Sequence, residues 1–233
     1  MDQNRKQEIG EAAAKILLET KSVLFNAKEP FVLTSGKLSP VYIDCRRLIA
    51  FVEERSDLMD MAAEILLGEI AEDIEYAAGG ETAGIPYAAF IAERLHKPML
   101  YIRKKPKGFG RMAQIEGTFH GEKKPKVLLI EDLQTDGGSK KVFIDALRDA
   151  GAEIKHAFVV FHYGIFEQSK KNMDDMGITL HELTNWWHVL NVAKQQNYFD
   201  EETLREVESF LKAPEIWQKM NEKKSGSTSS FAI

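Results

Sequence analysis

The sequence predicts an α/β protein with a mostly parallel, twisted sheet flanked by helices. The run Val127–Ile130 is apolar without alternation, which is typical of a strand covered by helices on both faces. Strand and helix patterns alternate through the middle of the chain, and this order favours parallel strands joined by right-handed crossovers. A hydrophobic fraction of 44% is sufficient to fill the core of such a sheet.

The N-terminal part predicts a helix, a hairpin and a second helix. Residues 7–20 place Ile9, Ala13 and Ile16 on one face, as in an amphipathic helix, and an apolar stretch follows as far as Phe25. Residues 32–43 predict a hairpin around Ser35 and Gly36. Residues 56–72 predict a helix that begins at Ser56 as its N-cap.

The remaining elements follow from the same patterns. We expect strands over 74–78, 99–103, 127–130, 157–161 and 178–183, and helices over 86–95, 140–150 and 165–176.

The segment after Ile130 predicts a site for a sugar phosphate. The strand is expected to end at Glu131 and Asp132, and ligands of open α/β sheets bind beyond the carboxyl ends of the strands. Carboxylates there suit ribose hydroxyls or a hydrated Mg²⁺. The turn that follows, with Gly137, Gly138 and Ser139, lets backbone N–H groups and a helix N-terminus approach an anion.

A basic segment precedes these acids. Between Tyr101 and Gly117 the chain carries five cations among proline and glycines: Arg103, Lys104, Lys105, Lys107 and Arg111. Most charge runs are simply solvated surface. The sharper interpretation is a mobile loop that closes on a departing pyrophosphate, which needs several donors at once and the exclusion of water.

These two motifs carry a resemblance to a known family. An aliphatic run, two acids, Thr135 and Gly-Gly-Ser resemble the phosphoribosyl pyrophosphate (PRPP) motif of type I phosphoribosyltransferases. The pattern Arg-Lys-x-x-Lys-x-x-Gly from Arg103 is similar to the catalytic loop of orotate phosphoribosyltransferases. The likeness spans roughly residues 11–190. It includes 30–44, which resembles the family's N-terminal substrate segment, and 79–86, which resembles its pyrophosphate loop.

The resemblance implies the type I phosphoribosyltransferase fold and its reaction. PRPP and orotate would give orotidine 5′-monophosphate and pyrophosphate in de novo pyrimidine synthesis. Mg²⁺ would be bound mainly through PRPP and water near Glu131 and Asp132. The implied catalytic residues are Lys107, Arg103 and Asp136. The implied PRPP-binding residues are Arg103, Lys104, Lys107, Glu131, Asp132, Thr135, Asp136, Gly137, Gly138, Ser139, Thr82 and Ala83. The implied orotate-binding residues are Thr135, Lys37, Tyr42, Ile43 and Tyr163.

The resemblance also implies an organisation of the chain. We expect one phosphoribosyltransferase domain over 1–223, with a small hood from 1–45 plus C-terminal elements and a core over about 46–185. Residues 224–233 are small and polar enough for a disordered tail. Family members are usually homodimers, so the loop 104–116 is expected to act on the neighbouring site.

The sequence departs from the family pattern at several positions. Lysines common in relatives are replaced by Thr34 and Ala83, and Phe109 stands where the loop often has a histidine. Phe109 cannot transfer a proton. The arginine that reaches the orotate carboxylate in many relatives is missing. His162 or Tyr163 is one possible substitute, and backbone amides with Arg46 or Arg47 are the other.

Two alternatives stay open: the same fold acting on another base, such as a purine, and a noncatalytic PRPP-sensing module. Composition and sequence patterns argue against several other classes of protein. Lysine and arginine number 31 against 36 acidic residues, a net charge of -5, which does not indicate nucleic-acid binding. The polar N-terminus is no signal peptide, and no apolar run approaches membrane-spanning length. A cytoplasmic enzyme is expected. The single Cys45 gives neither a disulfide framework nor metal-ligand spacing.

Overall fold

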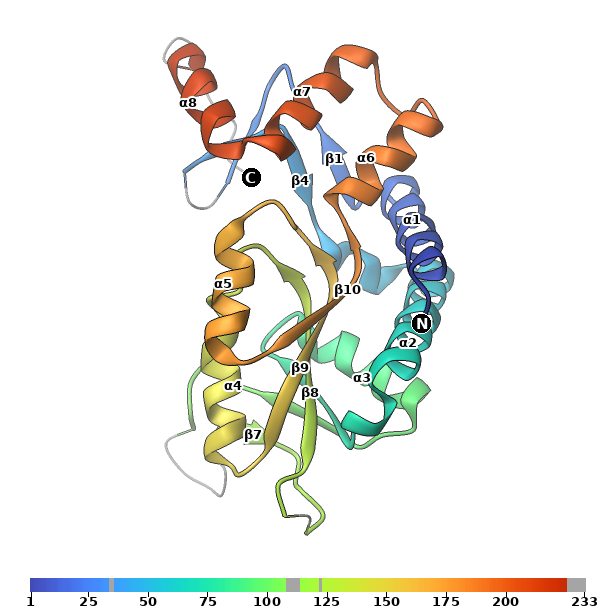
Figure 1. Ribbon diagram of the computed structural model, residues 1–233, viewed down its shortest axis with the longest axis vertical. Coiled ribbons are helices and arrows are strands. Elements are labelled where there is room, and N and C mark those ends of the chain that lie inside the picture. Colours follow the sequence, from blue (N-terminus) through green and yellow to red (C-terminus); the bar gives the residue numbers. More distant parts are fainter. Residues whose placement is uncertain (34–35, 108–113, 122, 226–233) are drawn as a thin grey trace.

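The computed structural model describes residues 1–33, 36–107, 114–121 and 123–225. In these ranges six strands form one twisted sheet in the order β10-β9-β8-β5-β6-β7 (Figure 1). All neighbours are parallel except β6 and β7, which are antiparallel. The predicted α/β architecture with a mostly parallel sheet is therefore confirmed. The strands are β5 (Tyr76–Gly80), β6 (Met99–Ile102), β7 (Ile115–Glu116), β8 (Lys126–Gln134), β9 (Glu153–His162) and β10 (Thr179–Asn185).

Helices cover both faces of the sheet (Figure 1). On one face lie α1 (Gln3–Glu19), α2 (Val52–Ile70) and α3 (Gly84–Leu95), and on the other lie α4 (Lys140–Asp149) and α5 (Glu167–Met176). Each face has its own apolar core, because alternate residues of the central strands point to opposite sides: Leu128 and Ile130 join one cluster, and Leu129 joins the other.

Short strands and the last helices gather beyond the carboxyl ends of the central strands (Figure 1). Two antiparallel pairs form there, β1 (Val23–Phe25) with β4 (Val41–Ile43) and β2 (Phe31–Val32) with β3 (Leu38–Ser39). Along the chain, the 3-10 helix η1 (Cys45–Ala50) follows β4, and a second one, η2 (Ala71–Asp73), follows α2. The last described helices are α6 (Trp186–Gln195), α7 (Glu201–Lys212) and α8 (Pro214–Ser225).

Beyond the carboxyl ends of the central strands, residues from the N-terminal and C-terminal parts of the chain are in contact. The ring of Phe25 stacks on Phe199 with 4.6 Å between centroids, and the amide of Gln218 donates to the carbonyl of Leu38 at 3.2 Å. Helix α1 instead packs against α2, α6 and β10. The division into a hood and a core stays a prediction. Helix α8 continues two residues into the predicted tail, and 226–233 lie outside the described residues.

Three local predictions are wrong. Helix α2 begins at Val52, not Ser56, because Glu53 and Glu54 supply the acidic first turn that a helix N-terminus favours. The hydroxyl of Ser56 accepts from Arg94 instead. The predicted hairpin holds for β2 and β3, but β4 turns away to pair with β1.

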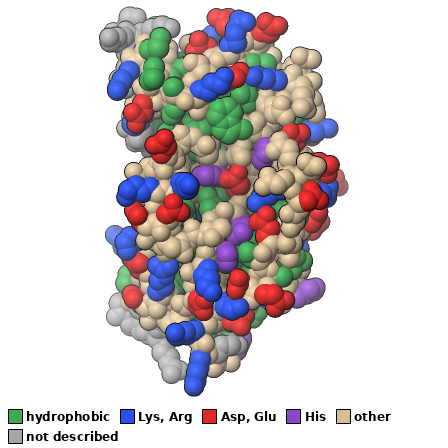
Figure 2. All heavy atoms as spheres, in the orientation of Figure 1, with side chains coloured by type: hydrophobic (Ala, Val, Ile, Leu, Met, Phe, Trp, Pro, Cys, Tyr) green, Lys and Arg blue, Asp and Glu red, His purple; other side chains and the backbone are tan. Residues whose placement is uncertain are grey.

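The third error concerns β8, which continues past the acid pair to Gln134. Residues 131–134 keep pairing with β9 after β5 has ended at Gly80. The acids therefore lie inside a strand that extends beyond its neighbour. None of the helices in the described part of the chain combines the length and apolar character that crossing a membrane requires. Basic and acidic side chains are interspersed over the face of the molecule shown in Figure 2.

Candidate active site

Strand register brings the predicted motifs to one edge of the sheet. Gly79 of β5 is paired with Ile130 of β8 on one side and with Tyr101 of β6 on the other. The residues that follow these strands are therefore at the same level. They are the acid pair, the loop from Glu81 and the basic segment from Arg103. Because β5 stops here, β8 has no paired strand on that side beyond Ile130.

The two acids on β8 have different surroundings. The carboxylate of Glu131 lies 2.7 Å from Nζ of Lys140, whose side chain is only 1% exposed. Asp132 is half-buried, and burial raises the pKa of its carboxyl group. Hydrogen bonds from the backbone of Asp132 and Leu133, and the positive charges of Arg46 and Lys140, oppose that increase.

Glycines let the loop after β5 pass close to β8. A Cβ on Gly84 would lie 2.4 Å from the carbonyl oxygen of Ile130, and one on Gly80 would lie 2.9 Å from Oε1 of Glu131. The backbone contact excludes a side chain at Gly84, and a side chain at Gly80 would require the Glu131 carboxylate to move. Thr82 is exposed, and the buried Ala83 is the N-cap residue of α3. The predicted pyrophosphate loop therefore lies against Glu131.

The turn between β8 and α4 has the compact form that its sequence predicts. Oδ1 of Asp136 accepts a hydrogen bond of 3.0 Å from the N–H of Gly138, and Gly137 has φ +78°. That conformation favours glycine. Thr135, Asp136, Gly138 and Ser139 are exposed, and the buried Lys140 begins the helix. An anion can therefore approach the turn from solvent.

The basic segment is held by an acid of β7. Carboxylate Oε1 of Glu116 forms an ion pair with Lys107 and lies 3.8 Å from a guanidinium nitrogen of Arg103. The N–H of Lys104 donates to the Glu81 carboxylate at 2.6 Å, which joins this segment to the loop after β5. Arg111 and Phe109 lie outside the described residues. The structure thus brings Arg103, Lys104 and Lys107 to the edge that carries the acid pair.

The residues that are predicted to bind orotate differ in their exposure to solvent. Lys37 is exposed and Tyr42 is half-buried against Phe31, whereas Ile43 is only 5% exposed. Tyr163 is buried among Phe161, Phe166 and Trp186, and burial raises the pKa of its hydroxyl. Thr34 and Ser35 lie outside the described residues.

Of the substitutes for the missing arginine, only Arg46 has an uncommitted side chain among the described residues. His162 uses both ring nitrogens, with Nδ1 2.5 Å from Glu182 and Nε2 2.8 Å from Ser169. Arg47 donates from Nε to the carbonyl of Thr20 and lies over the ring of Phe51. Arg46 is exposed, and its charge acts on Asp132.

Backbone contacts fix the position of Arg46 beside β8. Asp44 caps η1 by accepting from the N–H groups of Arg46 and Arg47, and the hydroxyl of Tyr87 donates to the carbonyl of Cys45 at 2.5 Å. Helix η1 in turn packs against β8.

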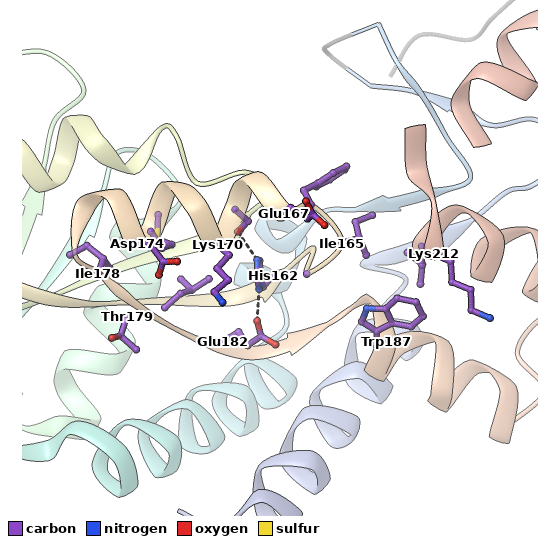
Figure 3. A pocket seen from close by; sticks show the side chains of 16 residues that line it. His162, Ile165, Glu167, Lys170, Asp174, Ile178, Thr179, Glu182, Trp187 and Lys212 are labelled. Atoms are coloured by element: carbon purple, nitrogen blue, oxygen red, sulfur yellow. Dashed lines mark hydrogen bonds and ion pairs between the residues drawn. The ribbon is translucent and has the colours of Figure 1, made fainter. Parts of the chain in front are cut away.

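A pocket of about 800 Å³ lies apart from these motifs, between α5, β10 and the last helices (Figure 3). His162, Glu182 and Trp187 line it, but none of the predicted PRPP or orotate residues does. The predicted site is the strand edge described above, because that is where the acids, the turn and the cations meet.

The donor set fits a magnesium ion that is held mostly by substrate and water. No group of three histidine, cysteine or acidic side chains in the described ranges is arranged to hold a metal. Glu131 is occupied by Lys140, and Asp132 offers one partly buried carboxylate. Mg²⁺ usually keeps several waters and takes one or two carboxylates plus substrate phosphates.

Sequence reasoning missed two residues of this site. Lys140 had a signal, because it shares the buried stripe of α4 with Phe143, Ile144 and Leu147 at helical spacing. A cation on an apolar stripe indicates a buried partner. Glu116 had none, since its contact with Lys107 depends on how the segment after β6 returns to pair as β7.

Curated proteins and solved structures are similar to this chain over most of its length. A scan of protein-family models finds no match to the chain. The orotate phosphoribosyltransferase of Roseobacter denitrificans is 52% identical over 219 residues, which cover 93% of this chain and 96% of that protein.

Solved structures show the same likeness. The orotate phosphoribosyltransferase of Aeropyrum pernix has a TM-score of 0.64 at 31% identity, with 80% of this chain and 99% of that chain covered. Leishmania donovani UMP synthase has a TM-score of 0.72 at 27% identity over 87% of this chain, which spans only 42% of that longer protein. Because the curated relative from Roseobacter denitrificans is 52% identical over 93% of the chain, the chain belongs to the orotate phosphoribosyltransferase family.

Proposed function

We propose that this protein transfers the phosphoribosyl group of PRPP to orotate, which gives orotidine 5′-monophosphate and pyrophosphate in de novo pyrimidine synthesis. One observation carries the proposal. The acid pair of β8, the anion-accepting turn after it and the cations around Glu116 meet at a single sheet edge. A ribose with a phosphate at one end and a diphosphate at the other needs these three features together.

Each part of PRPP has a matching group in this proposal. Asp132 and Glu131 accept hydrogen bonds from the ribose hydroxyls. The turn from Thr135 to Ser139 binds the 5′-phosphate through backbone N–H groups and the N-terminus of α4. Thr82 and Ala83 meet the pyrophosphate from the loop after β5, and Arg103, Lys104 and Lys107 meet it from the basic segment.

The chemistry is a displacement at C1′ of the ribose. A bond forms from N1 of orotate to C1′ while the bond from C1′ to the pyrophosphate oxygen breaks. The N1 proton of orotate is released to solvent, and pyrophosphate leaves with the electron pair of the broken bond. Asp136 favours the positive charge that develops on the ribose. Arg103 and Lys107 stabilise the negative charge that collects on the leaving group. For this they must exchange Glu116 for pyrophosphate.

Bound Mg²⁺ supplies charge neutralisation on the diphosphate. Asp132 and Glu131 are the residues near which it would be held, through water and the substrate. Lys140 orients the Glu131 carboxylate, because its buried ammonium group lies 2.7 Å away.

The orotate subsite combines Thr135 with the segment that carries Lys37, Tyr42 and Ile43. We place Arg46 at the orotate carboxylate, since it is the exposed arginine of this region whose guanidinium is not used elsewhere in the described structure. This assignment replaces Tyr163, whose ring is packed inside an aromatic cluster. A cytoplasmic location and a homodimer, with the loop 104–116 acting on the neighbouring site, complete the proposal.

Pyrophosphate release tests the proposal directly. Purified protein with PRPP and Mg²⁺ is assayed with orotate, uracil, adenine, hypoxanthine and no base. The proposal expects release with orotate alone. Release with a purine would keep the fold and overturn the substrate. PRPP binding without release in any reaction would indicate a sensor rather than an enzyme.

A further inference from the structure

A chain of hydrogen bonds crosses three neighbouring strands beside the pocket of Figure 3. It joins Glu182 of β10, His162 of β9, Ser169 of α5 and Gln134 of β8, and we call these four residues the relay. Nδ1 of His162 is 2.5 Å from Glu182 (Figure 3). Its Nε2 is 2.8 Å from Oγ of Ser169, and the Gln134 amide is 2.8 Å from the same Oγ.

The hydrogen bonds of the relay can all be donated in the same direction, from Gln134 toward Glu182. The amide nitrogen of Gln134 can only donate, so Oγ of Ser169 accepts from it. In the tautomer of His162 that carries hydrogen on Nδ1, the Ser169 hydroxyl donates to Nε2, and Nδ1–H donates to Glu182. The other oxygen of Glu182 accepts from the amide of Asn185 at 2.6 Å. Each member therefore orients the next one.

The inner end of the relay lies under the phosphate-binding turn. Gln134 is 1% exposed, and a Cβ added to Gly137 would lie 3.0 Å from its amide carbon. The backbone of Gln134 is also fixed, because its carbonyl accepts from the N–H of Tyr163 at 2.9 Å. Any movement of the Gln134 side chain is thus transmitted to Gly137.

Helix α5 supports the same turn at a second point. The amide of Asn172 donates to the carbonyl of Asp136 at 2.8 Å, and Met173 lies within 2.8 Å of where a Gly137 Cβ would be. The turn therefore rests on α5 and on Gln134, and the relay fixes the spacing between these two supports through Ser169.

Packing alone does not account for such a chain. Ser169 is 2% exposed, and burying hydroxyl, imidazole and carboxylate groups costs free energy that apolar side chains of the same size would not. The outer members His162 and Glu182 also line the pocket, so they are not needed to fill the interior. The hydrogen bonds between its members restrict their side chains, and rigidity at a phosphate-binding turn improves preorganisation.

We propose that Glu182, His162 and Ser169 are positioning residues for PRPP, which hold Gln134 under the turn and so set the affinity for the 5′-phosphate end of the substrate. The inference rests on the proposed function, in which this turn binds PRPP. It assigns the relay no contact with substrate and no proton transfer.

The test measures the dissociation constant of Mg²⁺-PRPP by calorimetry, so that it does not depend on turnover. Ser169→Ala removes the shared hydroxyl, and we expect the dissociation constant to rise about threefold to tenfold, the usual effect of one buried hydrogen bond. Ser169→Thr keeps a hydroxyl and should restore most of the affinity. In the assay, the KM for PRPP should rise while the KM for orotate stays within about twofold of wild type.

Two matched variants separate positioning from general loss of stability. Lys170→Ala changes an exposed neighbour of Ser169 that lines the same pocket outside the relay. Thr184→Val removes a buried hydrogen bond from β10 to the carbonyl of Gly10. The first should leave stability and PRPP affinity unchanged, and the second should lower the melting temperature without changing PRPP affinity.

A second relay variant covers the case in which Ser169→Ala fails to fold. His162→Leu removes two links of the chain and should also weaken PRPP binding. The double variant should bind no more weakly than the weaker single one, because both act through Gln134. Wild-type PRPP affinity in either folded variant overturns the relay, as does an equal rise in both KM values. If wild type binds PRPP but does not turn over orotate, the proposed function fails while the relay is still tested.

Discussion

Glu131 of β8 and Lys140 of α4 form an ion pair of 2.7 Å, with side chains that are 12% and 1% exposed. The pair joins the strand that carries the acids to the helix whose N-terminus faces the phosphate. It is the most deeply buried ion pair in the described part of the chain. The carboxylate proposed to bind ribose is therefore fixed by a cation that has no access to solvent.

Removing the cation should affect both folding and binding. Lys140→Met leaves Glu131 buried without its partner, and breaking such a pair costs about 3–5 kcal/mol of unfolding free energy. We expect a large fall in stability by denaturant titration and weaker PRPP binding. The pair Glu131→Gln with Lys140→Met should recover stability but not PRPP affinity. Lys141→Met, at an exposed neighbour paired with Asp145, is the control. Unchanged stability in Lys140→Met would contradict the importance of the pair.

Glu116 should compete with pyrophosphate for the cations. Its carboxylate pairs with Lys107 and lies near Arg103, whose side chains are 39% and 36% exposed. Glu116→Gln removes the competing charge, so the KM for PRPP should fall, by up to about fivefold for exposed ion pairs of this kind. The effect should shrink at high salt, since screening weakens such pairs. Glu201→Gln, on exposed α7 surface, is a suitable control. A higher KM for PRPP would mean that Glu116 positions the cations instead of competing for them.

Arg46 should govern orotate recognition and the ionisation of Asp132. Arg46→Ala should raise the KM for orotate about tenfold to a hundredfold, the range for a lost charge-assisted hydrogen bond. Arg46→Lys should recover part of that loss. Arg47→Ala should change stability without changing the KM for orotate, because Arg47 is bonded to Thr20. Equal effects of the two alanine variants on orotate would remove Arg46 from the subsite.

The same variant should shift the pH dependence of PRPP binding. Burial raises the pKa of Asp132, and the Arg46 charge opposes this increase. Without Arg46 the pKa rises further, so the carboxylate is lost at a higher pH. The acidic limb of the affinity profile should therefore move to higher pH in Arg46→Ala and stay in place in Arg46→Lys.

The stability of the protein should decrease below neutral pH. Burial lowers the pKa of His181, which contacts Glu69 and His156, and burial also lowers the pKa of His188. In each case the unfolded state binds the proton more tightly. The stabilising contribution of each neutral histidine is therefore complete above the unfolded pKa of about 6.5, and it falls as the pH decreases from there. Melting temperatures from pH 8 to 5 should show this fall, and His181→Gln should flatten it. A profile with the same slope in His181→Gln would rule out His181 as its origin.

Much of the site is readable in the sequence because its parts are local. The acid pair, the turn and the start of α4 are consecutive, and the strand order places them at a sheet edge. What is not readable depends on chain pairing. Glu131 lies inside β8 because β9 continues to pair with it after β5 ends. Glu116 meets Lys107 only because β7 returns beside β6.

Partner choice explains the other differences. His162 and Tyr163 are polar residues next to a strand end, and the sequence offers both for orotate. The structure uses both ring nitrogens of His162 within the protein and packs Tyr163 against Trp186. Ser56 has the character of an N-cap, yet the acids of the preceding turn begin the helix earlier. Local propensity is outweighed by tertiary contacts at these positions.

The central claim is that the carboxyl end of β8 and the turn after it bind PRPP. Calorimetry with Mg²⁺-PRPP tests this claim most directly. Asp132→Asn keeps the size of the side chain and removes its charge at the proposed ribose site. Asp145→Asn makes the same change on the exposed face of α4. The account predicts clear binding by wild type and Asp145→Asn, and binding at least tenfold weaker by a folded Asp132→Asn, roughly the effect of one lost charged hydrogen bond. Wild-type affinity in Asp132→Asn would contradict the account.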